Sequence, residues 1–133
     1  MLGYPFDAVV SGADEDAHLE AEPATYVLRT AQAKAEAVAH ALAGTRPDAL
    51  IIAADTTVAQ DGEIMAKPVD AADARRMLLA LRDRTHDVHT AICVVDSAGG
   101  RELSAVHSAA VTMRAYSLAE IDAYIATGDP LAK

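Results

Sequence analysis

The sequence predicts an α/β fold, a mixed β-sheet flanked by helices, with a central cleft at the strand ends. Three patterns support this prediction. Apolar residues recur at helical spacing after Pro23, an uninterrupted apolar run begins at Leu50, and polar and apolar residues alternate from Thr85 to Val95. A chain of 133 residues without repeats or linker-like segments is expected to form a single domain over residues 1–133.

The first part of the chain predicts a strand, a polar loop and a helix. Phe6 to Val10 is a short apolar run and is expected to be a strand. Ser11 to Glu22 is rich in acids, which are most simply a solvated surface. A helix is expected from Pro23 to about Gly44, because proline suits a first helical turn and glycine a C-terminal stop. Its apolar stripe combines small and aliphatic residues: Leu28, Ala31, Ala35, Val38 and Leu42.

The strand predicted from Leu50 to Val58 is the centre of the expected fold. Leu50 to Ala54 is apolar throughout, which is typical of a strand buried on both faces. Asp55 follows this run and is expected at its end, facing a cleft. The simpler interpretation, which the residues leave open, is that Asp55 only caps a turn with its side chain. Asp61-Gly62 then predicts a hairpin.

The second half predicts a helix, two long strands and a last helix. Asp70 is expected to begin the first of these helices, which should end near Arg82. The two strands are expected from Thr85 to Val95 and from about Glu102 to Arg114, joined by a turn containing Gly99-Gly100. Ser117 to Glu120 is a capping box that should open the last helix.

Composition limits the possible partners and compartments. The formal net charge of −9 disfavours binding to nucleic acid polymers and to anionic membranes, which draw on basic surfaces. Cys93 is the single cysteine, so no internal disulfide is possible and a reducing compartment fits best. No apolar run approaches the roughly 18 residues of a membrane span. A soluble, cytoplasmic protein is therefore expected.

Four charged residues on predicted loops, helix and strand ends form a candidate site: Glu15, Lys34, Asp55 and Lys67. Magnesium prefers carboxylate oxygens, lysines offset phosphate charge, and a carboxylate can deprotonate an attacking water. Walker-type phosphate loops and Gly-x-Ser-x-Gly motifs are absent from the sequence, which leaves metal-assisted hydrolysis of a phosphoanhydride as the favoured chemistry. Taken singly, the acids are as simply explained as solvated charges, and Lys34 as a lysine that extends to water.

Short motifs follow one another along nearly the whole chain: Leu2-Gly3-Tyr4-Pro5-Phe6, Asp14-Glu15, Ala31-Gln32-Ala33-Lys34-Ala35, Ala54-Asp55-Thr56-Thr57-Val58, Lys67-Pro68, Arg84-Thr85-His86 and Tyr124-Ile125-Ala126-Thr127-Gly128-Asp129-Pro130. Their order resembles that of the Maf family of nucleoside triphosphate pyrophosphatases (septum-formation Maf-like proteins). At two positions the family has glycine where this chain has Ala66 and Asp83. The ordered set carries the resemblance, because no single motif is decisive.

The resemblance implies hydrolysis of a (d)NTP to a (d)NMP and pyrophosphate by attack of water on the α-phosphate, with dTTP, UTP or a modified nucleotide as substrate. It implies that Asp55 accepts the proton and that Glu15 assists with the metal or the water, both acids being metal ligands. Lys34 and Lys67 would contact phosphates, and Thr56 would set substrate preference. The implied cofactor is a divalent metal, Mg²⁺ or Mn²⁺. A homodimer is left open.

The resemblance also implies a domain incomplete at both ends. Family members begin with a Ser-Pro-Arg-Arg loop that binds phosphates, and they continue past the position of Lys133 into a segment that closes the base pocket. Weak or absent turnover is therefore expected for the chain as written. Two alternatives stay open: a non-catalytic nucleotide-binding module linked to cell division, and an incomplete gene product without a function of its own.

Overall fold

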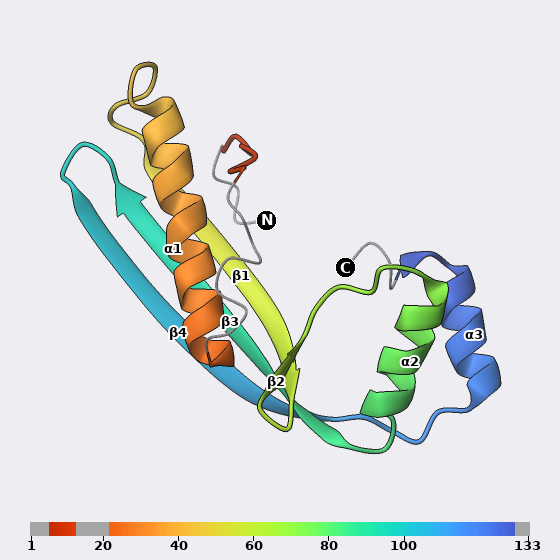
Figure 1. Ribbon diagram of the computed structural model, residues 1–133. Helices are drawn as coiled ribbons and strands as arrows, with labels where there is room; N and C mark the ends of the chain where they lie inside the picture. The colour runs from red at the N-terminus through yellow and green to blue at the C-terminus, as the bar shows by residue number, and fades with distance from the viewer. Residues whose placement is uncertain (1–5, 13–21, 130–133) are drawn as a thin grey trace.

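The computed structural model describes residues 6–12 and 22–129, and within them the chain forms helices on a β-sheet (Figure 1). The elements follow in the order α1 (Pro23–Leu42), β1 (Leu50–Gln60), β2 (Glu63–Met65), α2 (Ala71–Leu81), β3 (Thr85–Asp96), β4 (Arg101–Thr112) and α3 (Leu118–Ala126). The predicted α/β class, with helices flanking a sheet, is confirmed. In these residues no helix is both long and apolar enough to cross a membrane.

The described strands form an antiparallel sheet, rather than the mixed sheet expected, in the order β2-β1-β3-β4. The reason lies in the connection between β1 and β3. A parallel pair needs a helix that crosses over the sheet. Here α2 instead lies beside α3 at one end of the sheet (Figure 1), so β3 starts near the end where β1 finishes and runs back along it.

The core lies between α1 and one face of β1 and β3. Val27, Ala31 and Ala35 of α1 are fully buried, and they pack against Ile51, Ala91 and Cys93 of the sheet, among others. Alanines on both sides let the helix approach the strands closely. The predicted helical stripe is confirmed in its centre, and Tyr26 extends the core toward the start of α1.

The other face of β1 is exposed, which corrects the expectation of a strand buried on both sides. Ile51 is 5% exposed, whereas Leu50 and Ile52 on the opposite face are 67% and 68% exposed. Successive strand residues point to opposite faces, and among the described residues α1 covers only one of them. Asp55 lies in the middle of β1 and not at its end, since the strand continues to Gln60.

Phe6 to Val10, predicted as a strand, has no strand assignment in the structure. Phe6 is 69% and Val10 is 95% exposed, so the apolar side chains of this run are not placed in a core. Asp7 accepts a hydrogen bond from Arg46 at 2.6 Å, and this bond joins the segment to the chain after α1. An apolar run becomes a strand only with a hydrogen-bonding partner strand.

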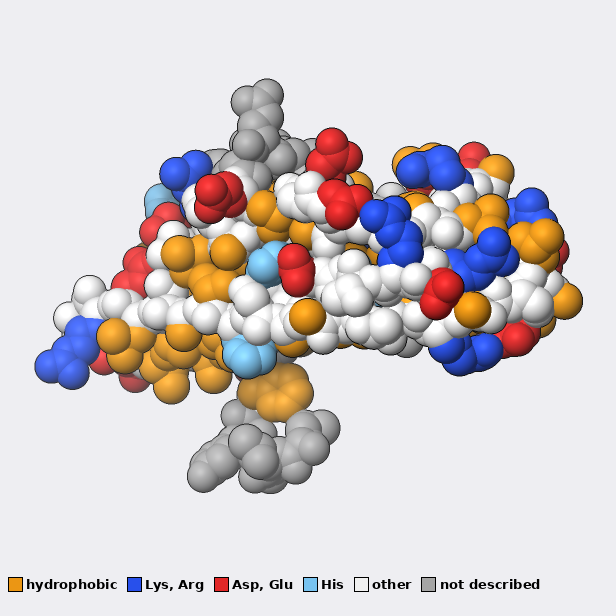
Figure 2. All heavy atoms as spheres, turned by 90° about the horizontal axis from the view of Figure 1, so that it is seen from below, with side chains coloured by type: hydrophobic (Ala, Val, Ile, Leu, Met, Phe, Trp, Pro, Cys, Tyr) orange, Lys and Arg blue, Asp and Glu red, His pale blue; other side chains and the backbone are white. Residues whose placement is uncertain are grey.

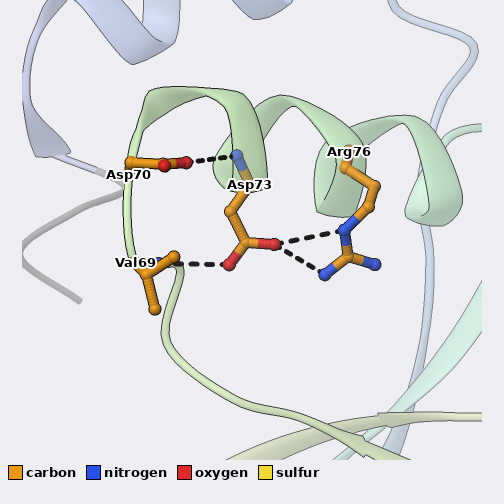
Figure 3. A network of polar contacts seen from close by, with 4 residues as sticks. All are labelled: Val69, Asp70, Asp73 and Arg76. Atoms are coloured by element: carbon orange, nitrogen blue, oxygen red, sulfur yellow. Dashed lines mark hydrogen bonds and ion pairs between the residues drawn. The ribbon is translucent and has the colours of Figure 1, made fainter.

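A polar network fixes the start of α2 (Figure 3). The Asp70 carboxylate accepts a hydrogen bond from the Asp73 backbone N–H at 2.8 Å, as a helix N-cap should. The Asp73 carboxylate accepts from the Val69 backbone N–H at 3.1 Å and from Arg76 at 2.7 and 3.1 Å. Arg76 first, and then the Val69 amide, lower the pKa of Asp73. This network sets the direction of the chain just after Lys67.

Two turns require positive φ. Asp61 (φ 54°) and Gly62 (φ 82°) form the two-residue hairpin loop predicted between β1 and β2. Asp83 also has φ of 54°, and its backbone N–H donates to the Arg114 carbonyl at 3.3 Å. A residue with a side chain is strained in this left-handed region, so glycine suits position 83 better than aspartate does.

Replacement of Asp83 tests this strain. We expect Asp83→Gly to raise the free energy of unfolding by about 0.5 kcal/mol, since relief of left-handed strain outweighs the extra backbone entropy of glycine. Asp83→Ala is the matched control and should lower it by a similar amount, because alanine tolerates positive φ less well than aspartate. Urea unfolding midpoints measure both. An Asp83→Gly variant less stable than Asp83→Ala would contradict the strain.

The thiol of Cys93 should be unreactive in the folded protein. Cys93 is fully buried, and burial first and Glu102 second raise the pKa of the thiol to about 11. At pH 8 only about one thiol in a thousand would be ionised, and the thiolate is the reactive form. We expect a disulfide reagent such as DTNB to label Cys93 only after denaturation. Rapid stoichiometric labelling of the native protein would contradict this burial.

Candidate functional site

An ion pair between α1 and β1 brings two of the predicted site residues together. Lys34 Nζ lies 3.2 Å from Asp55 Oδ1, and Lys34 also donates to the Ala54 carbonyl at 3.5 Å. The side chains are largely buried, at 21% exposure for Lys34 and 13% for Asp55. The simpler interpretation of Lys34, as a lysine that only extends to water, is therefore wrong, because its ammonium group binds a specific carboxylate.

Strand alternation and helix packing together produce this pair. Ile51, Ala53 and Asp55 point to the face of β1 that α1 covers, because side chains two apart share a face. Lys34 precedes the fully buried Ala35 on α1, so it lies at the border of the helical stripe that packs on the sheet. Ala91, the residue opposite Asp55 on β3, is fully buried. Solvent screens the two charges only weakly beside such small apolar side chains. The attraction between the Lys34 ammonium group and the Asp55 carboxylate is therefore stronger than between two exposed charges.

Polar residues outside the four predicted charged residues lie on this face of the sheet and on the helix above it. Thr57 is 7% exposed and lies opposite His89, whose Nδ1 is 2.7 Å from Ser108 Oγ. Thr30 on α1 is 1% exposed, and its hydroxyl has no hydrogen-bond partner within the described residues. The spacing of two from Asp55 could have pointed to Thr57. Only the strand register places His89 and Ser108 beside it.

Thr56 lies on the opposite face from Asp55. Its hydroxyl is 3.0 Å from that of Thr90, and both residues are on the face that α1 does not cover. A ligand that contacts the Asp55 carboxylate on the α1 side does not meet the Thr56 side chain there. The expectation that Thr56 acts beside Asp55 in the same site is not supported by this geometry, since adjacent strand residues point away from each other.

Lys67 and Glu15 are not joined to this pair by the described contacts. Lys67 is exposed in the connection between β2 and α2, and it has no hydrogen-bond or ion-pair partner in the described parts of the chain. The preceding strand places Ile64 against the α1 core, so this connection starts on the same side of the sheet as Asp55. Glu15 lies outside the described residues, and its predicted role stays a prediction.

The donor set is small for a metal ion. Within residues 6–12 and 22–129, no group of three or more His, Cys, Asp or Glu side chains could hold a metal. Magnesium, however, usually takes one or two protein carboxylates and completes its shell with water and substrate phosphates. Asp55 supplies one such carboxylate at the α1–β1 junction, and this fits a magnesium ion held in large part by a bound nucleotide.

A cavity of about 700 Å³ lies elsewhere, where α2 and α3 meet the chain after β4. Its walls are mainly apolar, with an ion pair between Arg114 and Glu120. The lining residues are Leu78, Thr112, Met113, Arg114, Tyr116, Glu120, Ile121 and Tyr124. They include none of the predicted site residues, so this cavity is not the predicted cleft at Asp55.

Comparison with known proteins agrees with the resemblance seen in the motifs. A chain from Salinibacter ruber named dTTP/UTP pyrophosphatase is 46% identical over 132 residues, covering 99% of this chain and 63% of the relative. Relatives of the same name from Deinococcus radiodurans and Burkholderia thailandensis are each 43% identical, with 64% and 67% of their lengths covered. The chain thus spans about two thirds of the length of these relatives. The family described as Maf-like protein matches residues 1–133. The chain therefore belongs to the Maf family.

Proposed function

We propose that this chain carries the catalytic pair of a nucleoside triphosphate pyrophosphatase that acts on dTTP and UTP. The observation that carries the proposal is the Lys34–Asp55 ion pair, at 3.2 Å, in a chain 43–46% identical to relatives named for this activity. A largely buried carboxylate beside a lysine places a proton acceptor and a positive charge in the same site, which suits attack of water on a phosphate.

The chemistry is transfer of the α-phosphoryl group to water. The Asp55 carboxylate takes a proton from the attacking water, whose oxygen bonds to the α-phosphorus. The bond from this phosphorus to the bridging oxygen breaks, and the oxygen leaves with pyrophosphate. Lys34 holds the carboxylate in position and offsets negative charge as phosphates approach. Lys67, exposed on the connection before α2, is proposed to bind the departing phosphates.

A divalent metal is part of the proposal. Asp55 would hold it with one carboxylate, and Glu15 is predicted to be the second protein ligand. Mg²⁺, or Mn²⁺ in its place, would supply positive charge to the phosphate oxygens. The residues themselves orient the water, accept its proton and fix the phosphates. A cytoplasmic location, expected from the single cysteine, stays a prediction.

Replacement of Asp55 tests the role of the carboxylate. We expect Asp55→Asn to lower pyrophosphate release from dTTP and UTP in the presence of Mg²⁺ by about 10²–10⁴-fold, since the amide is a poor base. Asp48→Asn is the matched control, because Asp48 is exposed and precedes β1. Nucleotide binding is measured in parallel by calorimetry. Because weak or absent turnover is expected for the chain as written, both variants are also measured in a form extended at both ends. Binding without turnover in the extended form would favour the non-catalytic module, and an extended Asp55→Asn variant at full rate would exclude Asp55 from the reaction.

Replacement of Lys34 tests the ion pair through stability. Lys34→Met keeps the length of the side chain and leaves the Asp55 carboxylate, 13% exposed, without this cation. We expect a loss of about 1–3 kcal/mol in the free energy of unfolding. Arg46→Met is the control, since it removes an ion pair to Asp7 whose side chains are 55% and 65% exposed. Exposed pairs contribute about 0–1 kcal/mol. Equal losses in the two variants would show that burial gives the Lys34–Asp55 pair no special strength.

A further inference from the structure

Thr57, His89 and Ser108 form a polar row across β1, β3 and β4, on the face of the sheet that α1 covers. Thr57 lies opposite His89, and His89 lies opposite Ser108. The Nδ1 atom of His89 is 2.7 Å from the Oγ atom of Ser108. Asp55 precedes Thr57 by two residues and therefore shares its face. Neighbouring rows on one face are about 7 Å apart, so the imidazole of His89 is within reach of a ligand that contacts Asp55.

The face under α1 is closed on one side of Asp55 and opens on the side of His89. Along β3 the side chains that share this face are Cys93 and Ala91, which are fully buried, His89, which is half-buried, and Asp87, which is exposed. Asp55 lies opposite Ala91, between the buried and the open parts of the face. A phosphate that reaches the Asp55 carboxylate from the open side therefore passes over the row that contains His89.

Positive charge gathers toward the end of the molecule at which this face opens. β3 starts at Thr85, soon after α2 ends at Leu81, so the exposed start of β3 lies toward the end that holds α2 and α3 (Figure 1). Figure 2 shows Lys and Arg side chains gathered toward this end, and hydrophobic side chains gathered toward the other end. Clustered positive charge attracts an anionic ligand, which favours approach of a nucleotide from the side of His89.

The connection that carries Lys67 lies on the other side of Asp55 from His89. In the strand order, β2 and β3 flank β1 on opposite sides. β2 pairs with Val58 to Gln60, and the chain leads from β2 to Lys67. A triphosphate bound at Asp55 thus has β3 with His89 on one side and the connection with Lys67 on the other.

We propose that His89 is a phosphate-binding residue of this site and donates a hydrogen bond from Nε2 to a phosphate oxygen of the bound nucleoside triphosphate. The inference rests on the proposed function, since it takes the nucleotide to bind at Asp55. The Ser108 hydroxyl can donate to Nδ1, and the neutral imidazole then carries its proton on Nε2. Ser108 is therefore a positioning residue, which orients the ring and directs the proton to the nitrogen that meets the phosphate. A hydrogen bond to a charged phosphate is stronger than one between neutral groups.

Asparagine and glutamine at position 89 separate the roles of the two ring nitrogens. The side-chain amide of asparagine takes the place of Nδ1, and that of glutamine takes the place of Nε2. His89→Asn therefore keeps the contact to Ser108 and loses the phosphate donor, whereas His89→Gln keeps the donor. His40→Asn and His40→Gln are the matched controls, because His40 is exposed in the last turn of α1.

All variants are measured in the form extended at both ends. Steady-state release of pyrophosphate from dTTP with Mg²⁺ gives KM and kcat. Calorimetry gives the affinity for dTTP in the Asp55→Asn background, where turnover is slow. We expect His89→Asn to raise the KM about tenfold and to leave kcat within about twofold, because a contact of equal strength in the bound substrate and the transition state affects binding alone. His89→Gln should stay within about threefold of the unchanged protein in KM, and the dTTP affinities should follow the KM values.

Ser108→Ala tests the positioning role. We expect it to raise the KM by about threefold when His89 is present, since the ring loses the partner of Nδ1. In the His89→Asn background it should have no further effect on KM, because the donor that Ser108 positions is already gone. Losses in the two backgrounds that are equal would show that Ser108 does not act through His89.

Equal KM values for His89→Asn and His89→Gln would overturn the proposed contact. So would a fall of kcat in both variants together with a lower thermal unfolding temperature, which indicates a structural role. If turnover depends on Asp55 and not on His89, the proposed function stands and the contact fails. If dTTP binding depends on His89 but the extended form releases no pyrophosphate, the contact stands and the proposed function fails. An extended form that does not bind dTTP would overturn both.

Discussion

The packing of α1 on one face of β1 and β3 is the contact on which the rest of this structure depends. Alanines on both surfaces, such as Ala31 and Ala35 on the helix and Ala91 on the sheet, allow the backbones to approach closely. That closeness brings the Lys34 ammonium within 3.2 Å of the Asp55 carboxylate while Cys93 and Ile51 stay buried beside them. A bulky residue at any of these alanines would separate the helix from the sheet and the lysine from its partner.

The same contact explains why the two faces of the sheet differ in role. The face under α1 holds the ion pair and the polar residues near it, including Thr57 and His89. The other face carries Thr56 together with exposed aliphatic side chains such as Ile52 and Leu103. Phosphate chemistry is therefore proposed for the face under α1. This difference follows from a sheet that the described helices cover on one side.

The second group of helices lies at one end of the sheet and is attached by few contacts. Gln60 at the end of β1 donates to the Ala80 carbonyl on α2 at 2.8 Å, and Tyr116 hydrogen-bonds to the Leu78 carbonyl. Asp70 and Asp73 fix the first turn of α2. These contacts hold the connection that carries Lys67 relative to β1. They therefore fix the backbone position from which Lys67 is proposed to contact phosphates, although the Lys67 side chain itself is exposed.

Local sequence determined the elements, because helix stripes, caps and turn residues act over a few neighbours. As predicted, Pro23 begins α1, Asp61-Gly62 forms the hairpin turn between β1 and β2, and Asp70 and Ser117 cap the starts of α2 and α3. The motif order also pointed to the family and to Lys34 and Asp55. Tertiary structure alone decided the rest. The apolar run at Leu50 could not reveal whether one or both faces are covered, since that depends on which helices reach the sheet. Tertiary contacts likewise decided that the run at Phe6 forms no strand and that the sheet is antiparallel. Side chains alternate along β1 and α1 covers one face of it, so Thr56 points away from the face that holds Asp55.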